Sequence, residues 1–152
     1  MSETVHGTAV LVGAHGVLIR GEPGRGKSIL AHALIARGAR LIADDRVALS
    51  ACHGRIVASA PAAISGLIEL RGRGVVAVPH ERFGVIRLIA DIVSEEALER
   101  MPENDQMSAA LLEIALPRQP VTAATEAALR LIEAALAAVS PQSDMGLRSA
   151  PV

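Results

Sequence analysis

The chain has 152 residues, of which 51% are hydrophobic and 1% aromatic, with a formal net charge of -1 at pH 7. This length suits one domain with an aliphatic core, and the lack of a basic face or aromatic stacking surfaces argues against a nucleic-acid partner. The single cysteine, Cys52, excludes an internal disulfide. With no apolar run of roughly 20 residues and no N-terminal signal pattern, we expect a cytoplasmic protein without a membrane partner.

Two short apolar runs near the start predict a β-hairpin. Residues 8–12 and 17–19 have strand character, and residues 13–16 form the turn between them. His6 lies just before the first strand and His15 lies in the turn. An isolated histidine is usually a surface or hydrogen-bonded side chain, so spacing alone assigns neither of them any chemistry.

A phosphate-loop pattern follows the second strand, in Gly21, Glu22, Pro23, Gly24, Arg25, Gly26, Lys27 and Ser28. Its glycines let several backbone N–H groups point at one anion, and the apolar helical pattern of residues 29–36 adds the positive end of a helix dipole. Lys27, the only lysine, would reach the β and γ phosphates of a nucleotide, and the Ser28 hydroxyl would bind magnesium. The alternative is a purely structural glycine-rich turn.

The next apolar run, residues 40–43, leads directly into Asp44 and Asp45. In phosphate-loop proteins a buried strand often ends in a carboxylate beside the magnesium ion. Because side chains alternate along a strand, we expect the two aspartates to face opposite sides and to have different roles. The alternative is that they only open a turn.

Residues 47–50 and 55–58 predict two more strands, joined at residues 51–54. The neighbouring Cys52 and His53 in this connection resemble part of a metal site. No second thiol or matching pair follows them, so a turn is the better interpretation.

Residues 67–74 place Glu69 in an apolar segment that ends in alternating arginine and glycine. Such a segment fits phosphate or acidic-partner binding, and the alternative is a helix end with solvated arginines. Two strands are expected next, over residues 75–78 and 85–93, and the second contains Asp91.

The last part of the chain predicts helices and a tail. Residues 95–105, which include Arg100, indicate a helix and then a loop. Pro120 and Thr122 are expected to open an Ala-rich helix whose apolar stripe comprises Leu129, Ile132, Leu136 and Val139. We therefore expect one catalytic domain over residues 1–139 and a flexible tail over residues 140–152.

The order of three motifs resembles the catalytic domain of HPr kinase/phosphorylase. The phosphate loop is followed by Ala43-Asp44-Asp45 and then by the Glu-x-Arg-Gly-x-Gly segment that begins at Glu69. The similarity extends over residues 6–102, and the third motif is the most specific. Many members of that family carry an additional N-terminal domain, so the chain looks like the short form with the catalytic domain only.

The resemblance implies roles for individual residues. His6, Lys27, Asp45 and Arg100 correspond to active-site residues, and Ser28 and Glu69 correspond to magnesium ligands. A serine hydroxyl that attacks phosphorus must lose its proton, and we expect the Asp45 carboxylate to accept it. Ile29 stands where the family usually has an acidic residue, and Pro23 where it usually has serine.

The resemblance also implies the fold and the activity. We expect an α/β domain with a mixed sheet around the strand-loop-helix core, like phosphoenolpyruvate carboxykinase, assembled as a hexamer. The implied activity is a kinase that uses ATP and Mg²⁺ to phosphorylate a serine of an HPr-like phosphocarrier, with reversal by phosphorolysis. Two alternatives stay open: a small-molecule kinase, and a nucleotide-binding regulatory protein without turnover.

Overall fold

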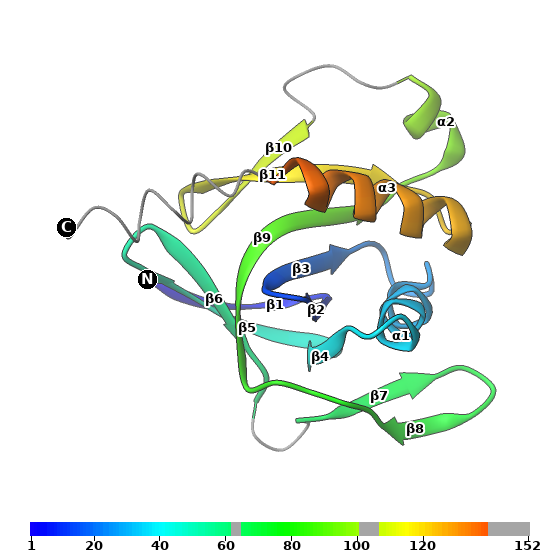
Figure 1. Ribbon diagram of the computed structural model, residues 1–152, viewed down its shortest axis with the longest axis horizontal. Helices are drawn as coiled ribbons and strands as arrows, with labels where there is room; N and C mark the ends of the chain where they lie inside the picture. The colour runs from blue at the N-terminus through cyan, green and yellow to red at the C-terminus, as the bar shows by residue number, and fades with distance from the viewer. Residues whose placement is uncertain (62–64, 101–106, 140–152) are drawn as a thin grey trace.

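The computed structural model describes residues 1–61, 65–100 and 107–139 (Figure 1). The expected tail over residues 140–152 therefore lies outside the described residues. The elements are, in chain order, β1 (Ser2–His6), β2 (Thr8–Val12), β3 (His15–Arg20), α1 (Lys27–Ala36), β4 (Arg40–Ala43), β5 (Arg46–Cys52), β6 (Arg55–Ser59), β7 (Leu67–Leu70), β8 (Gly74–Ala77), β9 (Phe83–Ile92), α2 (Glu95–Glu99), β10 (Ser108–Leu111), β11 (Ile114–Val121) and α3 (Thr125–Ala138).

Strand β9 is the centre of a mixed, curled sheet. It runs parallel to β3 and β11 and antiparallel to β6. β6 pairs with the first residues of β9, and β11 pairs with its last residues. β6 and β11 therefore lie one after the other along the same edge of β9, and β3 lies along the opposite edge. Figure 1 shows β9 as a long, bent strand. The expected mixed α/β fold is confirmed.

The sheet continues on both sides through antiparallel hairpins. β3 pairs with β2, which pairs with β4, and β6 pairs with β5, which pairs with β1. The predicted hairpin of residues 8–19 and the strand at residues 40–43 are therefore confirmed. Since β3, β9 and β11 are parallel, their carboxyl ends lie at the same edge, where open α/β sheets bind ligands.

Apolar side chains cover both faces of the central strands. Neighbouring residues of β3, Leu18 and Ile19, are both fully buried, as expected for a strand that is covered on each side. One face packs against α1 and α3, with a core that includes Val17, Ile19, Leu30, Leu34, Leu88, Leu129 and Ile132. The opposite face of the curled sheet encloses a second core that includes Leu18, Leu49, Ile56, Ile86, Ile89 and Leu111.

A separate hairpin, β7 and β8, packs against α1 (Figure 1). Its inner residue Ile68 is fully buried in the helix-side core, while Glu69 is exposed. The alternative interpretation of residues 67–74 as a helix end is therefore wrong, because the segment is a strand and a turn. Alternation along the strand lets Ile68 anchor the hairpin while Glu69 stays accessible.

The structure corrects two further expectations. His6 does not precede the first strand, because it ends β1, whose short polar sequence gave no apolar alternation. Pro120 and Thr122 do not open the last helix: Pro120 belongs to β11 and α3 begins at Thr125. Pairing with β10 ends at Pro117, so β11 is paired on one side only at Pro120, a situation in which strands tolerate proline.

The helices within the described ranges are short. None of them combines the length and the apolar character that a membrane crossing requires. The longest, α3, has 14 residues and packs its apolar stripe, including Leu129 and Ile132, on the sheet. Its role is thus to cover the core.

Replacing Ile132 with alanine tests that role. Ile132 is fully buried between α3 and the sheet, so Ile132→Ala should lower the free energy of unfolding by about 2–5 kcal/mol. The matched control on the same helix is Arg130→Ala, an exposed position where we expect a change within about 0.5 kcal/mol. Urea denaturation measures both, and similar costs for the two variants would contradict the assignment of the buried face.

Candidate active site

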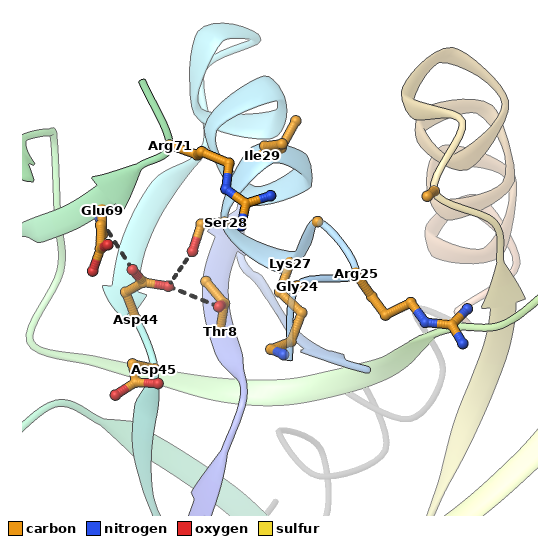
Figure 2. Close-up of a pocket in the computed structure, with 12 residues that line it drawn as sticks. Thr8, Gly24, Arg25, Lys27, Ser28, Ile29, Asp44, Asp45, Glu69 and Arg71 are labelled. Atoms are coloured by element: carbon orange, nitrogen blue, oxygen red, sulfur yellow. Dashed lines mark hydrogen bonds between the residues drawn. The ribbon is translucent and has the colours of Figure 1, made fainter. Parts of the chain in front are cut away.

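A hollow of about 410 Å³ lies beside the phosphate loop and the carboxyl end of β4. Figure 2 shows the side chains that surround it. The lining residues are Thr8, Gly24, Arg25, Gly26, Lys27, Ser28, Ile29, Asp44, Asp45, Glu69, Arg71 and Ala123. The loop, the aspartate pair and the glutamate predicted from separate motifs therefore meet in one hollow.

The connection between β3 and α1 contains two glycines in a left-handed backbone conformation. Gly24 and Gly26 have φ values of +80° and +97°, which favour glycine over other residues. Helix α1 begins at Lys27, and no acidic residue lies in its first turn. The N–H groups at the start of α1 and the positive end of the helix dipole therefore face the hollow, and the helix itself contributes no carboxylate there. The predicted strand-loop-helix arrangement is confirmed.

The Lys27 ammonium is held by the loop itself. Its Nζ donates to the carbonyl oxygen of Gly21 at 2.8 Å and to that of Glu22 at 3.3 Å. These neutral acceptors leave the positive charge of the ammonium uncompensated. An anion in the hollow would therefore attract Lys27 more strongly than its present partners do.

Asp44 connects three parts of the site through its carboxylate. Oδ1 accepts hydrogen bonds from the Thr8 hydroxyl at 2.8 Å and from the Ser28 hydroxyl at 2.9 Å. Oδ2 accepts from the backbone N–H of Glu69 at 3.2 Å. Figure 2 shows these interactions converging on one side chain, which is 8% exposed. A buried carboxylate with this set of donors is held in one orientation.

Asp45 has a different environment because of the turn that contains it. The backbone N–H of Arg46 donates to the carbonyl of Asp44 at 2.8 Å, so the turn spans Asp45, whose φ is +69°. This corresponds to the strained, positive-φ form of the γ-turn. The exposed Asp45 side chain lines the hollow and makes no hydrogen bond or ion pair with the residues that the structure describes.

Strand alternation does not separate the two aspartates. We expected them to face opposite sides, but β4 ends at Ala43 and both side chains line the same hollow. The turn, and not the pleat of a strand, gives one a buried and the other an exposed position. The expected difference between their environments is present, for another reason.

Glu69 and Arg71 approach the hollow from the hairpin of β7 and β8. Both side chains are exposed, and Arg71 extends toward the Ser28 side of the hollow in Figure 2. Among the described residues, no group of three or more His, Cys, Asp or Glu side chains is arranged to hold a metal. A metal that binds here would therefore need ligands from a substrate or from water as well as from the protein.

Two of the predicted active-site residues do not line this hollow. His6 pairs with Arg46 across β1 and β5 and lines a separate hollow of about 290 Å³ with Thr4 and Val5. Arg100 follows α2 and is exposed. Within the loop, Gly21, Glu22 and Pro23 also lie outside the lining, although two of their carbonyls bind Lys27. The roles of His6 and Arg100 stay predictions from the resemblance.

Sequence patterns did not identify Thr8 as a site residue. It begins β2, is 1% exposed, and bonds to Asp44. Threonine is common in strands for reasons unrelated to chemistry, so its position carried no separate signal. Only the packing of β2 against the end of β4 reveals its contact.

An ion cluster anchors the strand that leads into the phosphate loop. Arg20, the last residue of β3, binds Asp91 of β9 through two bonds of 2.7 and 2.8 Å, and Arg118 of β11 binds the same carboxylate. A lone aspartate in an apolar strand was the only sequence signal for it. The cluster fixes the residue immediately before Gly21.

The cluster shifts the ionisation of its members. Burial raises the pKa of Asp91, but hydrogen bonds from Arg20 and Arg118 outweigh this effect and hold the pKa below its usual value. The hydrogen bond to Asp91 raises the pKa of Arg20 against the opposing effect of burial. Asp91 therefore stays ionised in the folded protein to a lower pH than in the unfolded chain.

Residues 1–151 match the protein family described as HPr Serine kinase C-terminal domain. The chain belongs to this family. The resemblance found in the three sequence motifs is thus confirmed over almost the whole chain.

Relatives within the HPr serine kinase family agree with this assignment. The HPr kinase/phosphorylase of Clostridium tetani is 47% identical over 75 residues, which cover 49% of this chain and 25% of that protein. The protein of the same name from Lactobacillus delbrueckii subsp. bulgaricus is 47% identical over 76 residues, or 49% and 24% of the two chains. The chain thus spans about a quarter of the length of these curated relatives.

A solved structure from the same family shows that the fold is shared. The HPr(Ser) kinase/phosphatase from Coxiella burnetii aligns with a TM-score of 0.75 at 27% identity, covering 89% of this chain and 94% of that one. The overall fold described above is therefore shared with that structure.

Acid should weaken the ion cluster of this HPr serine kinase domain. The lowered pKa of Asp91 means that its bonds stabilise the fold above the unfolded-state pKa of about 3.9, and that this contribution is lost as pH falls through the folded-state value. Asp91→Asn should therefore lower the Tm at pH 7, and the difference from wild type should shrink below about pH 4. Glu3→Gln, an exposed carboxyl on β1, is the control. A difference in Tm that does not vary with pH would contradict the ionic role.

Proposed function

We propose that this domain is a Mg²⁺-dependent protein serine kinase that transfers the γ-phosphoryl group of ATP to an HPr-like phosphocarrier, and that reverses the transfer by phosphorolysis. The observation that carries the proposal is a single hollow in which a phosphate loop faces an exposed carboxylate, Asp45. The names of the relatives, HPr kinase/phosphorylase and HPr(Ser) kinase/phosphatase, support the choice of acceptor.

In this proposal residues 21–28 bind the phosphates of ATP. The loop N–H groups and the start of α1 supply hydrogen bonds and positive potential. Lys27 exchanges its carbonyl partners, Gly21 and Glu22, for the β and γ phosphates. The transition state spreads negative charge over the transferred group, so a cation already beside the loop stabilises it.

The residues beside the loop fit a magnesium ion. Mg²⁺ prefers oxygen ligands and keeps several waters, so one or two protein ligands together with phosphate oxygens suffice. The Ser28 hydroxyl and the Glu69 carboxylate are the proposed ligands, and both line the hollow. Asp44 accepts hydrogen bonds from the Ser28 hydroxyl at 2.9 Å and from the backbone N–H of Glu69 at 3.2 Å, so it orients the hydroxyl and fixes the backbone that carries the Glu69 side chain. Bound Mg²⁺ would neutralise charge on the phosphate oxygens.

Asp45 is the proposed proton acceptor for the serine hydroxyl. In the forward direction the serine oxygen attacks the γ-phosphorus of ATP, its proton passes to Asp45, and ADP leaves. In the reverse direction inorganic phosphate attacks phosphoserine, the serine oxygen leaves, and Asp45 returns a proton to it. Asp44 cannot readily do the same, because its carboxylate already accepts bonds from Thr8, Ser28 and Glu69.

Three finer features rest on the family resemblance. They are active-site roles for His6 and Arg100, a phosphoenolpyruvate-carboxykinase-like core, and a hexameric assembly. His6 pairs with Arg46, the residue after Asp45, so it lies near the proposed proton acceptor. Light scattering of the purified protein tests the hexamer directly.

The decisive experiment uses labelled ATP, Mg²⁺ and a panel of HPr-like proteins. Wild-type protein should label one carrier on serine, and Lys27→Ala should lower the rate by about 10²–10³-fold, because no other lysine replaces the lost charge. The control is Arg37→Ala, which removes an exposed cation from beyond the other end of α1 and should leave the rate unchanged. Circular dichroism verifies that each variant is folded.

Other outcomes would identify the alternatives. Label in a small molecule would indicate a small-molecule kinase, and nucleotide binding without turnover would indicate a regulatory protein. Ile29 would be a possible cause of binding without turnover, because it is an apolar residue, 52% exposed, that lines the hollow. Normal transfer by folded Lys27→Ala would show that this loop is not the site of phosphoryl transfer.

Asp45→Asn tests the proton acceptor. Loss of a general base should lower forward transfer and phosphorolysis together by about 10²–10⁴-fold, while ATP affinity changes much less. Asparagine tolerates the positive φ of this turn, so the backbone should be unaffected. Measuring both reactions and ATP binding side by side separates the possibilities. Loss of ATP binding with the chemistry intact would reassign Asp45 to metal positioning and make Asp44 the better candidate for the base.

A further inference from the structure

Thr8 is a buried polar residue whose hydroxyl is used in an unusual way. It is 1% exposed at the start of β2. Buried threonine hydroxyls commonly bond to nearby backbone groups, as Thr122 does when its oxygen accepts the N–H of Ala124. The Thr8 hydroxyl instead donates to the Asp44 carboxylate, which is 36 residues away in the sequence and lines the hollow.

The Thr8 bond determines how Asp44 meets Ser28. Both hydroxyls donate to the same oxygen, Oδ1, at 2.8 and 2.9 Å. A hydroxyl has a single proton. Because the Ser28 hydroxyl donates that proton to Asp44, the lone pairs of its oxygen are available to a metal ion. Oδ2 accepts the backbone N–H of Glu69, so one orientation of the Asp44 carboxylate bonds the Ser28 hydroxyl and the backbone that carries the second proposed ligand.

The backbone before Thr8 is fixed against the aspartate pair. The N–H of Gly7 donates to the carbonyl of Asp45 at 3.2 Å. A Cβ at Gly7 would lie 2.9 Å from the carbonyl oxygen of Ile19, so a side chain there would force β2 and β3 apart. Thr8 itself pairs with Ile19 in the sheet. The hydroxyl is therefore presented to Asp44 by a rigid part of the fold.

We propose that Thr8 is a positioning residue that sets the affinity of the site for its divalent cation. This inference rests on the proposed function, because it assumes a metal at Ser28 and Glu69. The Thr8 hydroxyl holds Oδ1 of Asp44 in place, and Asp44 in turn holds the Ser28 hydroxyl and the backbone of Glu69. Without the hydroxyl, Oδ1 keeps Ser28 as its remaining partner, and the carboxylate gains freedom to rotate. Loss of such supporting hydrogen bonds weakens metal binding while the ligands remain present.

The test measures metal binding directly, with Mn²⁺ as the probe. Electron paramagnetic resonance counts the Mn²⁺ bound to the domain in the presence of a non-hydrolysable ATP analogue. Thr8→Val keeps the shape of the side chain but removes the hydroxyl, and should weaken Mn²⁺ binding by about 10-fold. Thr8→Ser keeps the hydroxyl and should restore binding. The affinity for the analogue without metal should be the same in all variants.

The matched control is Thr122→Val. It makes the same chemical change at a buried threonine that is 8% exposed and does not line the hollow. It should lower the Tm without changing the affinity for Mn²⁺. If Thr8→Val reduces the folded fraction, Thr8→Ala provides the same comparison with a side chain that cannot crowd the strand.

The outcomes separate this inference from the function on which it rests. Wild-type protein that binds no Mn²⁺ with the analogue would overturn both. Wild type and Thr8→Val that bind Mn²⁺ equally tightly would overturn the role of Thr8 alone. Equal weakening of Mn²⁺ binding in Thr8→Val and Thr122→Val would also overturn it, because the effect would then be one of general stability.

Discussion

The candidate site depends on one buried carboxylate, that of Asp44. A charged group that is 8% exposed is costly unless donors replace its lost water. Its donors come from β2, α1 and β7, three elements that are distant in sequence. The requirement to satisfy Asp44 therefore couples the hairpin, the phosphate-loop helix and the separate β7 and β8 hairpin. The same bonds that stabilise the buried charge also arrange the hollow around it.

A second set of contacts holds the phosphate loop from the other side. The loop begins where β3 ends, and the bond from Arg20 to Asp91 fixes that end to β9. The carbonyl of the next residue, Gly21, receives the Lys27 ammonium. The loop is thus anchored at its start by an ion pair and at its end by the bond of Ser28 to Asp44. Between these anchors the glycines keep the backbone conformations that an anion site needs.

Local patterns predicted the elements around the phosphate loop, but not the strands β1, β10 and β11. The hairpin, the phosphate loop with its helix and the strand before Asp44 follow from apolar spacing and glycine positions, and all are present. Placement that depends on distant partners could not be read in this way. From sequence alone, Pro120 indicated the start of a helix. Only the pairing of β11 with β9 shows that Pro120 lies in a strand. In the sequence Thr8 is an ordinary strand residue, and only the folded structure shows its hydrogen bond to Asp44.

The positions of Asp44 and Asp45 show why two adjacent carboxylates suit this site. Strand alternation would have placed one of them away from the hollow, whereas the γ-turn leaves both facing it. The turn costs backbone strain at Asp45, of about 1–3 kcal/mol for such conformations. Bonds from Gly7 to the Asp45 carbonyl and from Arg46 to the Asp44 carbonyl offset that cost on either side. The fold thereby keeps one carboxylate fully bonded and its neighbour open to a substrate, a division that neither residue type nor spacing specifies.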